Sequence, residues 1–179
     1  LGDLNVAAPA SLCDTDNDGI LDGTSTQIKG SFDSDSTENF ELGSKLTLLD
    51  DRLQINAALY RMNWQDIPLV VLSPVPACAF AATANAGEAR SQGFEVETIY
   101  QVNQNLRINL GGAYTDAELT EVATGAPFSA GDRLPSTPNY NVNVGLQYEF
   151  ELSGYASYLQ GDYAYVGEFY NTPGEKGVK

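Results

Sequence analysis

Apolar and polar residues alternate without a break along YNVNVGLQYEFEL, residues 140–152. Successive side chains of a β-strand point to opposite faces, so this alternation separates an apolar face from a polar one. A strand of a soluble sandwich runs about 5–6 residues, and this segment is roughly twice as long. Tyr and Phe lie towards both ends of the apolar face, with Val and Leu between them. The segment therefore predicts a long strand whose apolar face ends in aromatic residues.

The same alternation recurs elsewhere in the chain, at residues 40–49, 53–59, 94–102, 106–114 and 155–170. Short connections join some of these segments, as in LDDRL, QVNQNL and ELSGY. Longer connections are expected at residues 1–37, 71–90 and 123–137. We therefore expect an all-β chain of about six long antiparallel strands, joined alternately by short turns and long loops.

Long strands with a polar face and an aromatic-ended apolar face are typical of transmembrane β-barrels. The apolar face of such a barrel meets lipid, the polar face lines the interior, and closure of the sheet satisfies the backbone. The sequence has no apolar run of about 18 residues, which a membrane-spanning helix would need. The predicted fold class is a partial antiparallel transmembrane β-barrel with long outer loops.

The charge of the chain is strongly negative and unevenly placed. It has 24 acidic and 9 basic residues, a net charge of −15. Nucleic-acid binding is excluded as a function because the phosphate backbone would be repelled and no basic patch is present. Residues 1–38 hold eight acidic residues against a single base, Lys29. We interpret this segment as a solvated loop or a cation site.

A calcium-type motif lies in this acidic segment, in the stretch CDTDNDGILDG at residues 13–23. Its candidate ligands are Asp14, Asp16, Asp18 and Asp22. Calcium binds several hard oxygen ligands, and Gly19 allows the sharp turn that such a loop needs. The twelfth position is Ser25, where an EF-hand has a bidentate Glu, so the motif resembles a single thrombospondin type 3 calcium repeat instead. We expect structural Ca²⁺ here, with a merely acidic, solvated loop as the alternative.

The two cysteines, Cys13 and Cys78, are far apart in the sequence. The chain has no His and no CxxC motif, which argues against a zinc site. The cysteines flank the predicted hairpin at residues 40–70. If residues 50–52 form a periplasmic turn, both cysteines lie in loops on the outer side. We expect them to form a disulfide, with two free thiols as the alternative.

Several segments, taken in order, resemble the C-terminal part of the barrel of TonB-dependent outer-membrane receptors. They are LQINAALYRMNWQDIPL, NAGEARSQGFEVET, LRINLGGAYTDAELTE and GDRLPSTPNYNVNVGLQYEF, within roughly residues 38–170. The resemblance implies a 22-stranded barrel filled by an N-terminal plug. It also implies import of a scarce nutrient with energy passed through TonB.

The chain departs from that family pattern in what it lacks. About six strands are expected here, without a plug, a TonB box or a terminal aromatic residue, so we interpret the sequence as a fragment. Three regions are expected: an acidic extracellular loop at 1–37, barrel strands and loops at 38–170, and the start of a further loop at 171–179. Alone, such a fragment would expose two unpaired sheet edges.

The resemblance implies a location in the outer membrane of a Gram-negative bacterium. The implied partners are outer-membrane lipid, a nutrient substrate, and TonB through the absent plug. The substrate class stays open among siderophore-iron, cobalamin, glycan and peptide, because binding residues would be shared with absent parts. An OmpA-like structural porin or adhesin and a secreted calcium-binding β-module are the alternative functions.

An enzymatic function is not expected. Glu95 and Glu97 lie about 7 Å apart on one strand face, which resembles the carboxylate pair of an inverting glycosidase. We interpret them as polar residues facing the barrel interior, because no His or activated nucleophile accompanies them. Trp64 is favoured as an interface or rim anchor over a substrate contact. Asp132 and Arg133 are favoured as turn residues over an ion pair.

Overall fold

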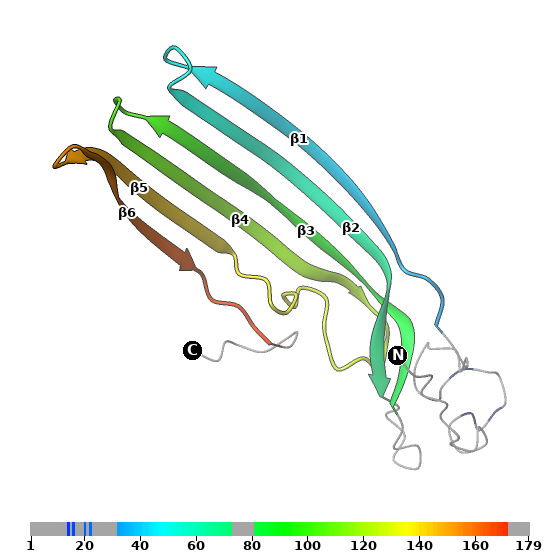
Figure 1. Ribbon diagram of the computed structural model, residues 1–179. Coiled ribbons are helices and arrows are strands. Elements are labelled where there is room, and N and C mark those ends of the chain that lie inside the picture. The colour runs from blue at the N-terminus through cyan, green and yellow to red at the C-terminus, as the bar shows by residue number, and fades with distance from the viewer. Residues whose placement is uncertain are drawn as a thin grey trace.

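The computed structural model describes residues 14, 16, 20, 22, 32–72 and 81–171, which form a single antiparallel sheet (Figure 1). Its strands are β1 (Ser36–Leu48), β2 (Leu53–Leu72), β3 (Ala81–Gln101), β4 (Leu106–Val122), β5 (Tyr140–Leu152) and β6 (Tyr155–Val166). Each strand pairs with its neighbours in sequence, in the order β1-β2-β3-β4-β5-β6. The prediction of an all-β chain of long antiparallel strands is confirmed.

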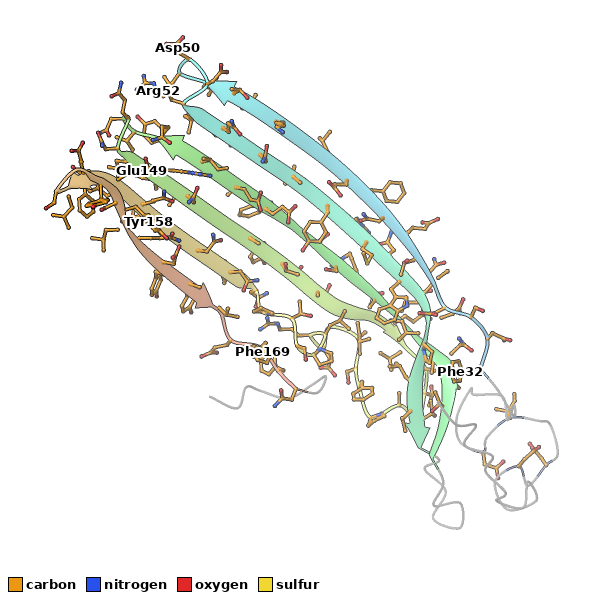
Figure 2. The ribbon with its side chains drawn as sticks, in the orientation of Figure 1. Phe32, Asp50, Arg52, Glu149, Tyr158 and Phe169 are labelled. Atoms are coloured by element: carbon orange, nitrogen blue, oxygen red, sulfur yellow. The ribbon has the colours of Figure 1, made fainter. Side chains whose placement is uncertain are left out.

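The sheet is long, curved and open. In the part of the chain that the structure describes, the outer edges of β1 and β6 have no partner strand. The short turns gather at one end of the sheet and the long connections at the other (Figure 1). Figure 2 shows Asp50 and Arg52 at the turn end and Phe32 at the opposite end. No helix among the described residues is long and apolar enough to cross a membrane.

The prediction of a long loop at residues 71–90 is wrong. β2 continues to Leu72 and β3 begins at Ala81, and these two residues pair with each other. The extended hairpin is largely apolar, and Val71 and Ala86 are buried in it. The run IPLVVL at residues 67–72 puts apolar residues on both sides of the strand, so a period of two did not reveal it.

A bulge interrupts β2 on the way to this extension. The register with β3 shifts between Trp64 and Ile67 and again at Pro68, and Asp66 has a φ of 58°. Pro cannot donate a ladder hydrogen bond and is tolerated at bulges and free edges. The pairing of β1 with β2 ends at Gln65, so Pro68 lies beyond the reach of β1.

The short turns have defined backbone geometry. In the β1–β2 turn, Leu49, Asp50 and Asp51 have φ values of 58°, 54° and 65°. Arg52 closes this turn, since its Nε donates to the Leu49 carbonyl at 3.1 Å. The β5–β6 turn uses Ser153 and Gly154, both with positive φ, as in a two-residue type I′ hairpin.

Candidate functional site

The register gives the sheet an apolar face and a polar face. On β5, Val144 pairs with Leu110 of β4 and Tyr163 of β6, and all three side chains share the apolar face. Asn143, one residue earlier, pairs with Gly111 and Ala164 on the polar face. Directly paired residues of an antiparallel sheet point to the same side, so the alternation read from β5 extends across its neighbours.

Aromatic residues mark both ends of the apolar face. At the loop end, the ring centroids of Phe94 and Tyr114 lie 6.0 Å apart, and those of Tyr114 and Tyr140 lie 5.1 Å apart. At the turn end, Tyr148 stacks on Phe150 at 6.2 Å. The ten steps from residue 140 to 150 span about 33 Å along the strand, or about 25 Å of height at a barrel tilt of roughly 40°. That height matches the apolar band of a transmembrane barrel.

The polar face carries charged residues of both signs. Glu95 and Glu97 lie on it together, as expected from the sequence, because they pair with Ala113 and Gly111 of β4. An open hollow brings them near residues of β1 and β2. Its polar lining residues include Glu41, Lys45, Asn56, Glu95 and Glu97. This surface offers carboxylate acceptors and one ammonium donor to water or to a polar partner inside the barrel.

Because Gly93 has no side chain, the Tyr60 side chain can cross β3 on the polar face. The Tyr60 hydroxyl reaches over β3 to hydrogen-bond the Thr115 hydroxyl of β4 at 2.8 Å. A Cβ atom at Gly93 would lie 2.0 Å from the Tyr114 carbonyl oxygen and 2.9 Å from the Tyr60 hydroxyl. Only glycine therefore fits at this position without displacing the backbone of β4.

The polarity of the two faces reverses beyond the row of Phe94, Tyr114 and Tyr140. On the side that was apolar, the next residues in register are Arg61, Gln92 and Asp116, followed by Asn63, Arg90 and Glu118. Arg90 donates to Glu118 at 2.5 Å, and Gln92 donates to Asp116 at 3.3 Å. The apolar band of the outward side therefore ends at the aromatic row, although the strands continue.

The opposite side of the same extension is apolar and buried. Ile67, Ala89 and Leu119 form a hydrophobic cluster there, with Phe128 and Leu134 of the β4–β5 connection packed against it. Backbone hydrogen bonds hold this connection to the C-terminal part of β4. Leu119 N donates to Asp132 O at 2.8 Å, and Leu134 N donates to Ala117 O at 2.9 Å. The long β4–β5 loop is thus fixed to the wall.

Arg133 links this loop to the segment that follows β6. Its guanidinium lies 4.9 Å from the ring centroid of Tyr170 and donates to the Thr137 carbonyl at 3.3 Å. Asp132 instead accepts a hydrogen bond from the Ser129 backbone at 2.8 Å, as a turn residue does. The Arg133–Tyr170 contact was missed in the sequence because nothing local connects two residues in different loops.

Two side chains, Trp64 and Asn85, fix the chain just before β1. Trp64 donates through Nε1 to Asp35 at 2.6 Å, on the side of the sheet that carries the buried cluster. Asn85 accepts from the Asp33 backbone N–H at 2.6 Å and donates to the carbonyls of Asp33 at 2.8 Å and Asp66 at 2.7 Å. Trp64 therefore fixes the base of the acidic segment at the rim of the wall.

The structure brings three of the four expected calcium ligands together. One carboxylate oxygen from each of Asp14, Asp16 and Asp22 lies within 4.8 Å of the others. Asp14 is buried, with 8% of its surface exposed. Asp18 lies outside the described residues, as do Cys13 and Cys78, so the expected disulfide stays a prediction.

Residues 8–178 match the family model described as "TonB dependent receptor-like, beta-barrel". The chain belongs to this family. The resemblance stated from the sequence is thereby confirmed, and so is the fold class, because solved TonB-dependent receptors share the arrangement of these strands.

Among curated proteins, the chain is similar to TonB-dependent and related receptors. It is 34% identical over 119 residues to the metal-pseudopaline receptor CntO of Pseudomonas aeruginosa, which covers 66% of this chain and 16% of that protein. It is 26% identical over 126 residues to the probable TonB-dependent siderophore receptor PiuA of Acinetobacter baumannii, with the same coverage of both chains. The chain therefore spans about one sixth of these relatives, 16% in each case.

Among solved structures, the ferric yersiniabactin uptake receptor FyuA of Yersinia pestis superposes with a TM-score of 0.61 at 20% identity. That match covers 76% of this chain and 19% of FyuA. The ferric-catecholate import receptor Fiu of E. coli K12 superposes with a TM-score of 0.58 at 18% identity, over 84% of this chain and 20% of Fiu. At these identities the likeness shows the shared TonB-dependent receptor fold.

Proposed function

We propose that this chain forms part of the wall and outer loops of a Gram-negative outer-membrane receptor that imports a scarce nutrient. The observation that carries this proposal is the band of apolar residues, bounded by aromatic rows, opposite a polar face on strands of the TonB-dependent receptor family. The apolar face meets lipid and the polar face lines the interior. The protein binds and transports and carries out no catalysis.

Metal chelates of the siderophore type are the substrate class that we propose. Support comes from the names of two relatives, a metal-pseudopaline receptor and a probable siderophore receptor. The energy for import would come from TonB through a plug domain in the complete receptor. The substrate itself would bind to surfaces contributed by several parts of that receptor.

Deletion of the gene tests this function. The mutant should lose energy-dependent uptake of a radiolabelled metal–siderophore complex, and the intact gene should restore it. Uptake of a small sugar through general porins serves as the control and should not change. The receptor proposal would be contradicted by a mutant that keeps energy-dependent uptake of metal–siderophore complexes and becomes less permeable to small solutes. That result would support a structural porin.

We also propose that the acidic segment binds Ca²⁺ through Asp14, Asp16 and Asp22, with Asp18 as a fourth ligand. The support is the proximity of one carboxylate oxygen from each of these three residues, all within 4.8 Å of one another, because Ca²⁺ binds several such oxygens together. Backbone carbonyls and water would complete the 6–8 oxygen ligands that Ca²⁺ prefers. The role would be structural, and a dissociation constant on the order of 10⁻⁴–10⁻³ M suffices outside the cell.

Calcium should protect the acidic segment from proteolysis in the intact receptor. We expect cleavage within residues 10–31 to slow in millimolar calcium and to accelerate with chelator, because the bound ion orders the loop. The double variant Asp16→Asn and Asp22→Asn should be cleaved quickly under both conditions. Glu38→Gln, which removes a nearby charge outside the cluster, should behave like the wild type. Cleavage that is insensitive to calcium in the wild type would leave only a solvated acidic loop.

The cysteines should be inaccessible to thiol reagents until they are reduced. We propose a disulfide between Cys13 and Cys78. Cys13 precedes β1 in the sequence and Cys78 belongs to the connection between β2 and β3, and both of these segments adjoin the loop end of the sheet. The outer side of the membrane is an oxidising compartment, in which disulfides persist. A membrane-impermeant maleimide applied to intact cells should label them only after reductant. Labelling of both cysteines without reductant would show that they are free thiols.

A further inference from the structure

Arg61 lies just outside the apolar band, on the side of the sheet that meets lipid. The last residues of the band there are Leu59, Phe94, Tyr114 and Tyr140, which pair with one another across β2 to β5. Arg61 is the next residue of β2 on this side, about 7 Å beyond Leu59 along the strand. With the short turns in the periplasm, as expected from the sequence for residues 50–52, this is the level of the outer-leaflet headgroups.

The guanidinium of Arg61 is exposed and only weakly engaged. Among the residues that the structure describes, it donates one hydrogen bond, from Nε to the Asn63 side-chain oxygen at 3.3 Å. Its direct neighbour on β1 is Phe40, whose side chain is 64% exposed on the same side. An exposed aromatic ring beside a cation is the pairing found where a protein surface crosses from lipid tails to headgroups.

Two acidic side chains on the same side of the sheet as Arg61 interact with other residues. Glu118 pairs with Arg90, and Asp116 accepts from Gln92. Glu38 is exposed on the same side of β1, but its partner in register is Asn63. In the described part of the chain, no ion pair or hydrogen bond joins Arg61 to a carboxylate, and its side chain is exposed.

We propose that Arg61 binds a phosphate group of an outer-leaflet lipid and so fixes the height of the receptor in the membrane. The guanidinium fork matches a phosphate in a bidentate manner, and such a charge-assisted contact is stronger than a neutral hydrogen bond. The apolar tails of the same lipid would lie against Phe40, Leu59 and Phe94. This inference rests on the membrane orientation in the proposed function.

Lipid binding to the purified full-length receptor in phosphatidylcholine nanodiscs tests the proposal. The probe is phosphorylated lipid A, and lipid A with its phosphates removed is the chemical control. Arg61→Ala should weaken binding of phosphorylated lipid A about tenfold, the loss expected for a charge-assisted hydrogen bond. Arg61→Lys should recover part of that loss, because it restores the charge without the fork.

A variant at another arginine, on the polar face near the short turns, is the control for nonspecific charge. Arg107 lies on β4 and pairs with Gln147 on the polar face, so Arg107→Ala should bind like the wild type. Equal affinity of wild type and Arg61→Ala, or equal affinity of the wild type for both lipids, would overturn the phosphate site alone. An equal loss in Arg107→Ala would overturn the site at Arg61, because binding would then follow the positive charge of the receptor alone. Failure of the membrane orientation is detected separately, by equal damage from Val144→Arg and Asn143→Arg.

Discussion

Val144→Arg should impair insertion or stability of the receptor barrel by about 2–4 kcal/mol, the cost of placing Arg on the lipid face near the bilayer midplane. Val144 lies midway along the apolar face of β5, between Leu110 and Tyr163. A guanidinium there would be far from both aromatic rows and would lose its water. The measurement is the urea midpoint of unfolding in detergent-free vesicles, followed by the mobility shift of folded barrels on gels.

Asn143→Arg provides the matched control for this prediction. Asn143 precedes Val144 on the same strand but points to the polar face, and its neighbours Gly111 and Ala164 are small. A longer, charged side chain can extend into the polar interior there. We expect the stability of this variant to remain within about 0.5 kcal/mol of wild type, as for other surface substitutions. Equal damage from both variants would contradict the assignment of the two faces.

Gly93→Ala should also destabilise the barrel, by about 1–3 kcal/mol, for a steric reason. The added methyl group would meet the Tyr114 carbonyl oxygen at 2.0 Å, so the backbone of β3 or β4 must shift. The same shift would break the hydrogen bond between the Tyr60 and Thr115 hydroxyls. The urea midpoint should fall, and folded receptor should accumulate to a lower level.

Gly43→Ala tests whether the effect is specific to Gly93. Gly43 also lies on the polar face, on β1, but a Cβ atom there would meet only the Ala57 carbonyl oxygen at 3.8 Å, an ordinary contact. We expect this variant to be neutral or slightly stabilising, because Ala loses less backbone entropy than Gly on folding. A neutral Gly93→Ala variant would show that β3 and β4 can separate there at little cost.

The sequence predicted the strands well only within the apolar band. The alternation at 140–152 coincides with β5, whose bounds are Tyr140–Leu152. The alternation at 53–59 and 106–114 instead ends where the polarity reverses, while β2 and β4 continue to Leu72 and Val122. Arg61 and Asp116 occupy positions that would be apolar if the strands were still in the membrane. The hydrophobic pattern therefore reports the end of the band and not the end of the strand.

The site could be predicted from the sequence only where its residues are close together in the chain. The aspartates of the acidic segment form a local motif, and three of them do lie together. The contacts of Asn85 with Asp33 and of Arg133 with Tyr170 join distant segments through the sheet register and loop packing. No pattern of residue types encodes such contacts, so they emerge only from the fold.

Spin labels placed along β5 of the full-length receptor test the assignment of the two faces of the barrel wall most directly. Single cysteines at positions 141 to 147, in a background with Cys13→Ser and Cys78→Ser, would carry the label in native membranes. Labels at positions 142, 144 and 146 should be relaxed mainly by oxygen, which concentrates in lipid. Labels at 141, 143, 145 and 147 should be relaxed mainly by a water-soluble nickel complex. An accessibility pattern without a period of two, or with the two sets exchanged, would contradict the account.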